Sequence, residues 1–338
     1  MNLNSQIFTE GLVKCVVKNN VGIFRPIMFD WDRSYGVALM NPSVYNDGGI
    51  IRSCVRCVNY TLHHSEHSKY PHWAGPLQYV HPETDVRLAT ENFIAEFDDV
   101  NLDLVSAKFV DMTLNVPTKW NFHGLEDGRL IRWNNKLYLT GVRRDTTDNG
   151  QGRMELSEIE IKDDIVTEIN RVRIPSTGND DSYCEKNWMP VIDQSYTYIK
   201  WSNPTEIVKV KVNSENNTAQ ISNQIIESSR YPVNVEVRGG SHVVPYENYY
   251  IAFGHSVSLW KPYSGEKDSD YKAHIMIWDK NFNLIKITDG FKFLNSKIEF
   301  SCGLCLDNNN QFIVSFADMD NAAYLLRFDP NWLLNELI

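Results

Sequence analysis

Residues 123–140 read HGLEDGRLIRWNNKLYLT, a stretch that places two adjacent acids and an arginine in a tight, glycine-containing bend. An apolar run follows the bend, and Asn134-Asn135 separates it from a second apolar run. Turn-forming residues between two such runs are typical of a β-hairpin. We therefore expect a hairpin that presents the carboxylates of Glu126 and Asp127 at the rim of a sheet. The Arg129 guanidinium beside them would hold their ionisation state.

The rest of the chain follows the same pattern of short strand and turn, and helical periodicity is scarce. After the first, the turn signals recur at intervals of roughly 50–60 residues, which indicates repeated four-stranded units. They are Asn46–Gly49, Asn134-Asn135, Asp193-Gln194, Tyr246–Asn248 and Asp307–Asn310. Residues 273–285 predict a further, outer hairpin.

About five such units in an all-β chain predict a five-bladed β-propeller. We expect a single domain over residues 1–338 that ends in a short helix at Asn331–Ile338. The structural alternative is a pair of β-sandwich domains, but the sequence contains no Pro- or Ser-rich linker between two halves.

The composition excludes several classes of partner. The chain has 338 residues, with 33 basic and 43 acidic side chains and a net charge of -10, which argues against nucleic acid or an acidic membrane surface. No apolar run of about 20 residues predicts a membrane helix, and the first residues lack the layout of a signal peptide. We therefore expect a soluble, cytoplasmic protein. Its 9 Trp and 16 Tyr suit strand cores and also sugar-stacking surfaces.

Two pairs of cysteines have the CxxC spacing of zinc ligands, namely Cys54 with Cys57 and Cys302 with Cys305. Both pairs lie in runs that predict strands, where residues three apart point to opposite faces of the sheet. Neither pair can then hold a metal ion easily. We expect free, partly buried thiols instead.

Two other patterns favour a metal at first sight. A histidine-rich tract at residues 63–72 has no tidy ligand spacing with a carboxylate, so we expect an exposed loop beside the ligand site. Asp318-Met319-Asp320 resembles the Asp-x-Asp metal–nucleotide motif of many glycosyltransferases. That motif belongs at the end of a Rossmann-type strand, which this chain does not predict. We expect no metal and no cofactor.

Clusters of unusual polar residues open a strand about once in each proposed blade. In a propeller the innermost strands line a central funnel, so residues far apart in sequence can meet at its mouth. The clusters are Arg56–Tyr60 preceded by Asn41–Ser43, Glu126–Arg129, Glu185–Pro190, Arg238–Ser241 followed by His255, and Glu299–Gly303 followed by Asp318.

This order of motifs resembles glycoside hydrolase family 130, which contains five-bladed propeller mannoside phosphorylases and hydrolases. The related β-1,2-mannosyltransferases of glycosyltransferase family 108 share that scaffold. The resemblance spans roughly residues 40–320 as short motifs rather than continuous identity. Glu126–Arg129 carries most of it, and it departs from the usual Glu-Asp-Pro-Arg by having Gly128 in place of proline.

The resemblance implies a role for each matching residue. Asp127 would donate the proton to the glycosidic oxygen, and Glu126 and Arg129 would shape its environment. The remaining sugar-binding group would comprise Arg56, Asn59 and Tyr60 as the first-blade wall and Asp318 on the hydroxyls of the non-reducing-end sugar. Trp188, in a motif that departs from the family pattern, adds a bulky wall. Glu299 is an alternative base for water.

The residues that would bind phosphate or a phosphorylated donor are Lys186, Asn187, Arg238 and His255, with Arg143 or Arg144 as further cations. A single-displacement inverting reaction needs one acid near the leaving oxygen. When phosphate is the attacking group, the opposite face needs a cationic pocket rather than a second carboxylate.

We therefore expect a carbohydrate-active enzyme that makes or breaks a β-mannoside-type bond with inversion. Mannose comes from the resemblance alone. The expected partners are a carbohydrate substrate and either inorganic phosphate, a sugar 1-phosphate or a nucleotide sugar. Glu185–Trp188 departs from the phosphorylase pattern, so phosphorolysis and transfer from a nucleotide sugar both stay open. A non-catalytic sugar-binding propeller is the alternative from another class.

Overall fold

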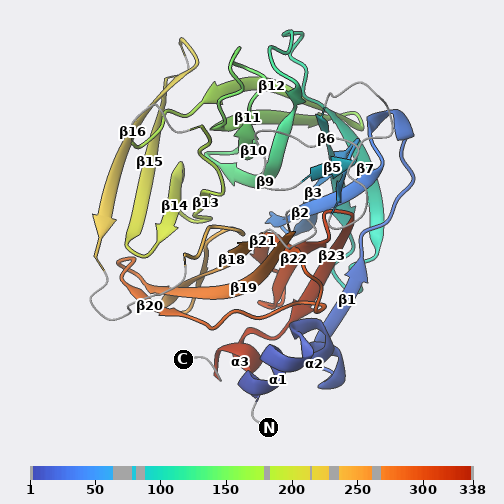
Figure 1. Ribbon diagram of the computed structural model, residues 1–338, viewed down its shortest axis with the longest axis vertical. Helices are drawn as coiled ribbons and strands as arrows, with labels where there is room; N and C mark the ends of the chain where they lie inside the picture. The colour runs from blue at the N-terminus through green and yellow to red at the C-terminus, as the bar shows by residue number, and fades with distance from the viewer. Residues whose placement is uncertain are drawn as a thin grey trace.

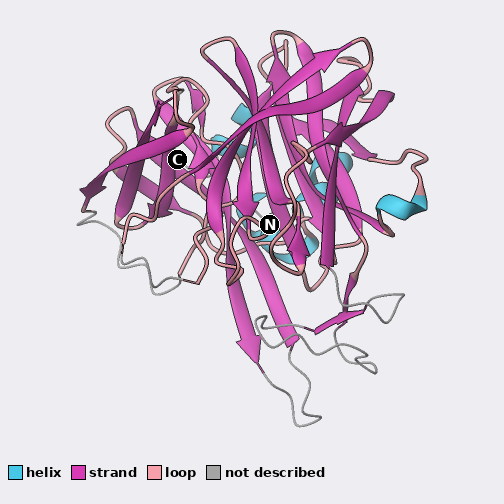
Figure 2. Cartoon of the chain, turned by 90° about the horizontal axis from the view of Figure 1, so that it is seen from above, coloured by secondary structure: helices cyan, strands magenta, loops and turns pink. Residues whose placement is uncertain are grey.

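The computed structural model describes residues 3–63, 78–80, 88–178, 183–213, 215–227, 236–260 and 268–335. Strands make up most of these residues, and the helices are few and short (Figure 2). The all-β class is therefore confirmed. Among the described residues, no helix has the length and apolar character that crossing a membrane requires.

The largest sheet contains nine strands. Eight form one path, and the ninth, β8 (Phe122–His123), pairs with β6. The path runs β2 (Ala38–Asp47), β3 (Ile50–Val58), β6 (Leu88–Phe97), β7 (Leu104–Asp111), β12 (Ile165–Arg173), β11 (Arg153–Lys162), β10 (Lys136–Arg143) and β9 (Leu125–Trp133). A short parallel contact between β7 and β12 joins two halves, and within each half neighbouring strands are antiparallel.

Three further sheets have four antiparallel strands each. In order they are β13 (Met189–Pro190), β14 (Thr197–Ser202), β15 (Thr205–Asn213) and β16 (Thr218–Ile226); β17 (Val244–Tyr246), β18 (Tyr249–Trp260), β19 (Asp268–Asp279) and β20 (Leu284–Ile287); and β1 (Gly22–Pro26), β23 (Ala322–Phe328), β22 (Phe312–Asp318) and β21 (Glu299–Leu306). A separate pair consists of β4 (Thr61–His63) and β5 (Gln78–Val80). The first strand of the chain therefore completes the last sheet.

The strands β2, β9 and β21 pack against one another in the middle of the molecule (Figure 1). Nearly every residue of β2 and β21 is buried, whereas β16, at the outer edge of its sheet, is mostly exposed. Strands covered on both faces are built from near-continuous apolar residues. Polar side chains on these inner strands are therefore unusual, and Asn41 and Asp127 are two of them.

All five predicted turns connect neighbouring strands, and the outer hairpin over residues 273–285 corresponds to β19 and β20. At the turn between β9 and β10, Asn134 and Asn135 both have positive φ angles, 50° and 64°. This is the conformation that the tightest hairpin turns require and that asparagine tolerates.

The helices differ in part from the expectation. The C-terminal helix α3 is shorter than predicted and covers Pro330–Leu334, with Asp329 capping its first turn. Two N-terminal helices, α1 (Leu3–Glu10) and α2 (Leu12–Lys18), were not predicted, and a single turn of 3-10 helix, η1, spans Arg33–Tyr35. The α-helices lie together at one edge of the molecule (Figure 1). Side chains from all three enter one core cluster. Helices this short are not stable alone and depend on such packing.

The cysteines are free thiols, as expected, and those of the CxxC pairs are buried. Cys54 belongs to one core cluster and Cys57 to another, which confirms that the two side chains point to opposite faces of β3. Of the histidine-rich tract, His63 ends β4, while His64, His67 and His72 lie outside the described residues.

Candidate active site

Asp127 lies near the start of β9, where the ladder with β10 contains a β-bulge. The register shifts between Thr140 and Val142, so Asp127 and Gly128 together face the single residue Gly141. A bulge turns a side chain out of the regular alternation of a strand. The backbone of Asp127 is accordingly left-handed, with φ at 51°. A Cβ at position 141 would lie 2.3 Å from a main-chain oxygen of the bulge, so this position requires glycine.

The same irregularity recurs elsewhere in this sheet and in two other sheets. The shifted residues are Asn41 and Pro42 in β2, Lys200 in β14 and Cys302 in β21. Two of these bulges converge on Asp127. The Asn41 side chain donates from Nδ2 to Oδ1 of Asp127 at 2.8 Å, and Cys302 Sγ lies 3.8 Å from its main-chain oxygen. The bulges therefore build the site by re-aiming one residue from each of several inner strands.

The Asp127 carboxylate is held in a buried clamp. Arg56 donates from Nη1 to Oδ1 at 2.9 Å, beside the bond from Asn41. Burial raises the pKa of Asp127, but the Arg56 charge, the Asn41 hydrogen bond and the charges of Arg129 and Lys186 lower it by more. The pKa is below its ordinary value, so the carboxyl is ionised at neutral pH in the unliganded protein.

Arg56, Asn59 and Tyr60 are the residues predicted as the first-blade wall, and Arg56 hydrogen-bonds to Tyr60. Arg56 Nη2 donates to the Tyr60 hydroxyl at 2.5 Å, and its Nε donates to Thr90 Oγ1 at 3.2 Å. Burial raises the pKa of Tyr60 well above its ordinary value, so the phenol stays neutral. Asn59 accepts from the main-chain nitrogen of Ala89 at 2.8 Å. Arg56 and Tyr60 therefore flank Asp127, while Asn59 ties the end of β3 to β6.

Arg129 hydrogen-bonds to the backbone of the bulge, and its charge also lowers the pKa of the Asp127 carboxyl. Its Nη1 donates to the main-chain oxygen of Asp127 at 3.1 Å, and its Nε donates to that of Gly240 at 2.6 Å. The guanidinium is fully buried and thus links β9 to the segment before β17. Glu126, on the other side of the bulge, lies 3.5 Å from Arg144 Nε.

Asp320 is a second carboxyl of the site, and the sequence prediction had chosen Asp318 in its place. Asp320 lies in the turn between β22 and β23 with φ at 49°. Burial and the negative charges of Asp127 and Glu126 raise its pKa to about 6, although Arg56 and Lys186 act in the opposite direction.

Asp318 ends β22 and pairs in register with Glu299. Its Oδ1 is buried and accepts no hydrogen bond within the described part of the chain.

A pocket of about 260 Å³ is lined by three cations and by the two acids Glu185 and Glu236. Lys186, Asn187 and Arg238, which the sequence suggested for phosphate or donor binding, line this pocket together with Lys200. Lys200 Nζ lies 3.0 Å from Glu185 Oε2, and Arg238 Nε lies 2.7 Å from Glu236 Oε1. Lys186 is exposed, and its charge acts on both Asp127 and Asp320.

His255 lies beside this pocket but does not add to its charge. Burial, reinforced by the charges of Arg238 and Lys186, lowers the pKa of His255 to about 3, so the ring is neutral. The ring stacks on Tyr271 with centroids 5.5 Å apart and meets the Phe300 ring edge-on at 4.9 Å. Its backbone pairs with that of Arg238 in both directions, at 2.8 and 2.9 Å. In the unliganded protein His255 is therefore not one of the cations, and its assignment to phosphate or donor binding stays a prediction.

Three other predicted residues have structural contacts instead. Trp188 is fully buried, donates to Glu185 Oε2 at 3.3 Å and packs on Tyr198, so it forms core rather than a pocket wall. Arg143 is buried against Glu155 at 3.1 Å. Glu299 accepts from the main-chain nitrogens of residues 294 and 296 at 2.8 and 2.9 Å, which leaves its carboxylate committed to a turn. Each of these three side chains therefore makes its contacts within the folded core or a turn.

Sequence reasoning left Asn41, Lys200 and Asp320 out of the site. Asn41 is part of the Asn-Pro-Ser motif, which was used only for the family resemblance. Asp320 is part of the Asp-x-Asp pattern, which was considered only as a metal–nucleotide motif. Lys200 had no signal in the sequence. Among the described residues, no three His, Cys, Asp or Glu side chains are grouped as metal ligands.

The fold of the chain is similar to the folds of several solved structures. No family model matches the chain, and no curated protein matches it. The structure of a β-1,2-mannobiose phosphorylase from Listeria innocua, in complex with β-1,2-mannobiose, has a TM-score of 0.55 at 12% identity, covering 93% of this chain and 96% of that one. A glycosyl hydrolase from Bacteroides ovatus has a TM-score of 0.53 at 10% identity, covering 87% and 85%.

A mannose phosphorylase from Leishmania mexicana, in complex with phosphate, has a TM-score of 0.50 at 11% identity, covering 95% and 93%. Identities this low establish the fold and not the activity. The chain is thus similar in fold to mannoside phosphorylases and glycosyl hydrolases, which confirms the resemblance to glycoside hydrolase family 130.

Proposed function

We propose that the protein is a carbohydrate-active enzyme that makes or breaks a β-mannoside-type bond by inverting phosphorolysis or its reverse. One observation carries the proposal. The buried Asp127 carboxylate, clamped by Arg56 and Asn41, lies within electrostatic reach of a cationic pocket that contains Lys186 and Arg238. An acid for the leaving oxygen and cations for an anionic nucleophile are the two requirements of this reaction.

The reaction joins a phosphate oxygen to the anomeric carbon while the bond from that carbon to the glycosidic oxygen breaks. The leaving oxygen takes up a proton, and Asp127 is our candidate for delivering it. Of the two carboxyls, Asp320 takes up a proton first as the pH falls, since the pKa of Asp320 is raised to about 6 and that of Asp127 is lowered. Carboxyl pairs with pKa values pushed apart are a recurrent acid–base arrangement.

Phosphate binding would also change the charge state of Asp127. A phosphate dianion beside Lys186 offsets the positive charge that lowers the pKa of Asp127, so that pKa rises. The acid is then able to take up a proton when the nucleophile is in place.

We further propose that the chain is a single five-bladed propeller. The two halves of the nine-stranded sheet and the three four-stranded sheets supply five antiparallel runs of four strands. Similarity to folds of sugar-active enzymes over most of the chain supports this architecture. The pocket and the carboxylates would then lie around the inner strands β2, β9 and β21.

A product assay tests the reaction. The protein is incubated with mannose and either mannose 1-phosphate or GDP-mannose, and the disaccharide is followed together with released phosphate or GDP. Disaccharide and phosphate from mannose 1-phosphate support the proposal. Product from GDP-mannose alone would exclude phosphorolysis in favour of sugar-nucleotide transfer, and sugar binding without product from either donor would favour a non-catalytic propeller.

The variant Asp127→Asn separates catalysis from binding. It keeps the shape of the side chain, so sugar binding should persist while turnover falls by at least a hundredfold, the usual contribution of a positioned acid being about 10²–10⁴-fold. Asp163→Asn, in the exposed turn between β11 and β12, is the matched control and should leave turnover unchanged. Unchanged turnover in Asp127→Asn would remove this residue from the mechanism.

A further inference from the structure

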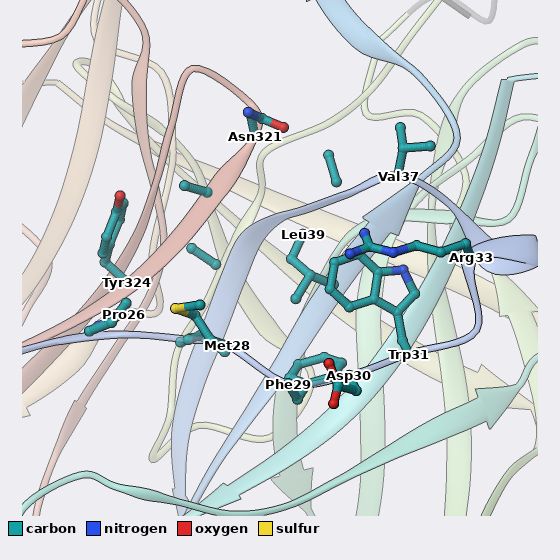
Figure 3. A pocket seen from close by; sticks show the side chains of 14 residues that line it. Pro26, Met28, Phe29, Asp30, Trp31, Arg33, Val37, Leu39, Asn321 and Tyr324 are labelled. Carbon is teal, nitrogen blue, oxygen red and sulfur yellow. The ribbon is translucent and has the colours of Figure 1, made fainter. Parts of the chain in front are cut away.

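A groove of about 570 Å³ lies between the segment after β1 and the strands β2 and β23 (Figure 3). This volume falls in the range of about 300–1,000 Å³ that is usual for small-molecule sites. Met28 and Leu39 lie in the middle, with Tyr324 and Pro26 on one side and Trp31 on the other (Figure 3). None of these residues belongs to the candidate active site.

The lining is mainly apolar, and several of its aromatic and apolar side chains are open to solvent. Met28 is 73% exposed and Val37 is 40% exposed, although both are hydrophobic. The one indole donor in the lining is already used, since Trp31 Nε1 donates to the main-chain oxygen of Gly36 at 3.0 Å. The Arg33 guanidinium covers one face of the Trp31 ring at 3.9 Å. Asp30, Arg33 and Asn321 add polar groups to this lining, and an apolar group bound against Met28, Val37 and Leu39 would be shielded from water.

The groove shares two chain segments with the candidate active site. Asn321 lines the groove, and the preceding residue, Asp320, interacts electrostatically with Asp127. Leu39 lines the groove, and Asn41, two residues further along β2, donates to Asp127. A strand advances about 3.3 Å per residue, so these two positions are only about 7 Å apart along the chain.

Core packing also connects the two places. Ala38 lines the groove and belongs to the same small apolar cluster as Tyr60, the residue that bonds Arg56. Ala317, close to the turn that carries Asp320, is in that cluster too. The two sites are therefore neighbours in the fold.

We infer that the groove binds the apolar aglycone of a glycoside whose sugar lies at Asp127, an inference that rests on the proposed function. The substrate or acceptor is then a mannoside with an alkyl or aryl group rather than a free oligosaccharide. The apolar lining supplies binding energy by removing hydrocarbon from water, and the adjoining carboxylates and Arg56 bind the hydroxyls.

Direct binding tests the inference without any need for turnover. Dissociation constants of methyl β-mannoside and octyl β-mannoside are measured by calorimetry below the micelle concentration. Each methylene that becomes buried strengthens binding by about fourfold, so two are enough for about fifteenfold. We expect the octyl compound to bind at least tenfold more tightly. In Met28→Glu this preference should fall below threefold, because a charge then lies in the middle of the groove.

Val105→Glu is the matched control, since Val105 on β7 is also exposed, at 67%, and lies outside the groove. It should keep the full preference. Equal binding of both mannosides by the wild type overturns the inference, whether or not the protein is active. If the octyl compound binds more tightly but the protein has no turnover, the proposed reaction is refuted and the inference about the groove stands. Sedimentation that shows a dimer dissociated by Met28→Glu would instead assign the groove to a second copy of the chain and overturn the inference.

Discussion

Replacing Arg56 with methionine removes the charge that faces the Asp127 carboxylate and keeps most of the side-chain volume. Arg56 is 6% exposed and Asp127 8%, so the low value of surface ion pairs, about 0–1 kcal/mol, does not apply. Breaking a buried pair from one side costs about 3–5 kcal/mol because the other charge is left unpaired. The hydrogen bonds from Arg56 to Thr90 and Tyr60 are lost as well.

We therefore expect the free energy of unfolding of Arg56→Met to be about 3–5 kcal/mol below that of the wild type at pH 7. The assay is urea denaturation followed by tryptophan fluorescence at several pH values. In the wild type the lowered pKa of Asp127 contributes stability above the unfolded-state pKa, and that contribution is lost as pH falls through the folded-state pKa. In the variant, burial acts unopposed by Arg56, so Asp127 gains a proton at higher pH and the deficit shrinks as the pH is lowered.

The double variant Arg56→Met, Asp127→Asn decides between this reasoning and simple loss of packing. With no charge left to bury, it should recover most of the stability that Arg56→Met loses at pH 7. A deficit below about 1 kcal/mol in Arg56→Met, or additive losses in the double variant, would refute the view that the buried charge dominates.

Two further outcomes follow from the geometry. Asp320→Asn should raise the melting temperature at pH 8 but not at pH 4. The reason is that a carboxyl with its pKa raised to about 6 destabilises the fold only when it is ionised. Equal shifts of the melting temperature at both pH values would contradict this. Gly141→Ala should lower the free energy of unfolding by about 1–3 kcal/mol, since its Cβ would overlap the Glu126 oxygen, whereas Gly178→Ala, with no atom near its Cβ, should be neutral in chemical denaturation.

Local patterns predicted the hairpins correctly because turn chemistry is local. The turn at Asn134-Asn135 could be predicted from the φ preferences of asparagine and from the apolar runs on either side of it. The motif around Asp127 was found for the same reason. Its bulge was not predicted, because the extra residue is defined by the pairing partner Gly141 in the next strand.

The candidate site is hardest to predict where burial decides the role of a residue. A tryptophan in a polar motif suits a pocket wall and a core equally well, and Trp188 became core because Tyr198 and Glu185 surround it. Asp318 and Asp320 differ by two positions, which place side chains on the same face within a strand. That rule does not extend to Asp320, because Asp320 lies in the turn after β22 and has a left-handed backbone.

The pairing of β1 with β23 constrains how the chain reaches its native state. Gly22 is opposite Phe328 and Pro26 is opposite Tyr324, so the last sheet gains its outer strand only when segments some 300 residues apart in sequence meet. Such closure is entropically costly and late in folding. Until it happens, β23 presents an unpaired edge that neighbouring chains can extend. During synthesis β1 emerges long before its partner. We expect a chain truncated before residue 322, which lacks β23, to leave β1 and β22 with unpaired edges that favour aggregation.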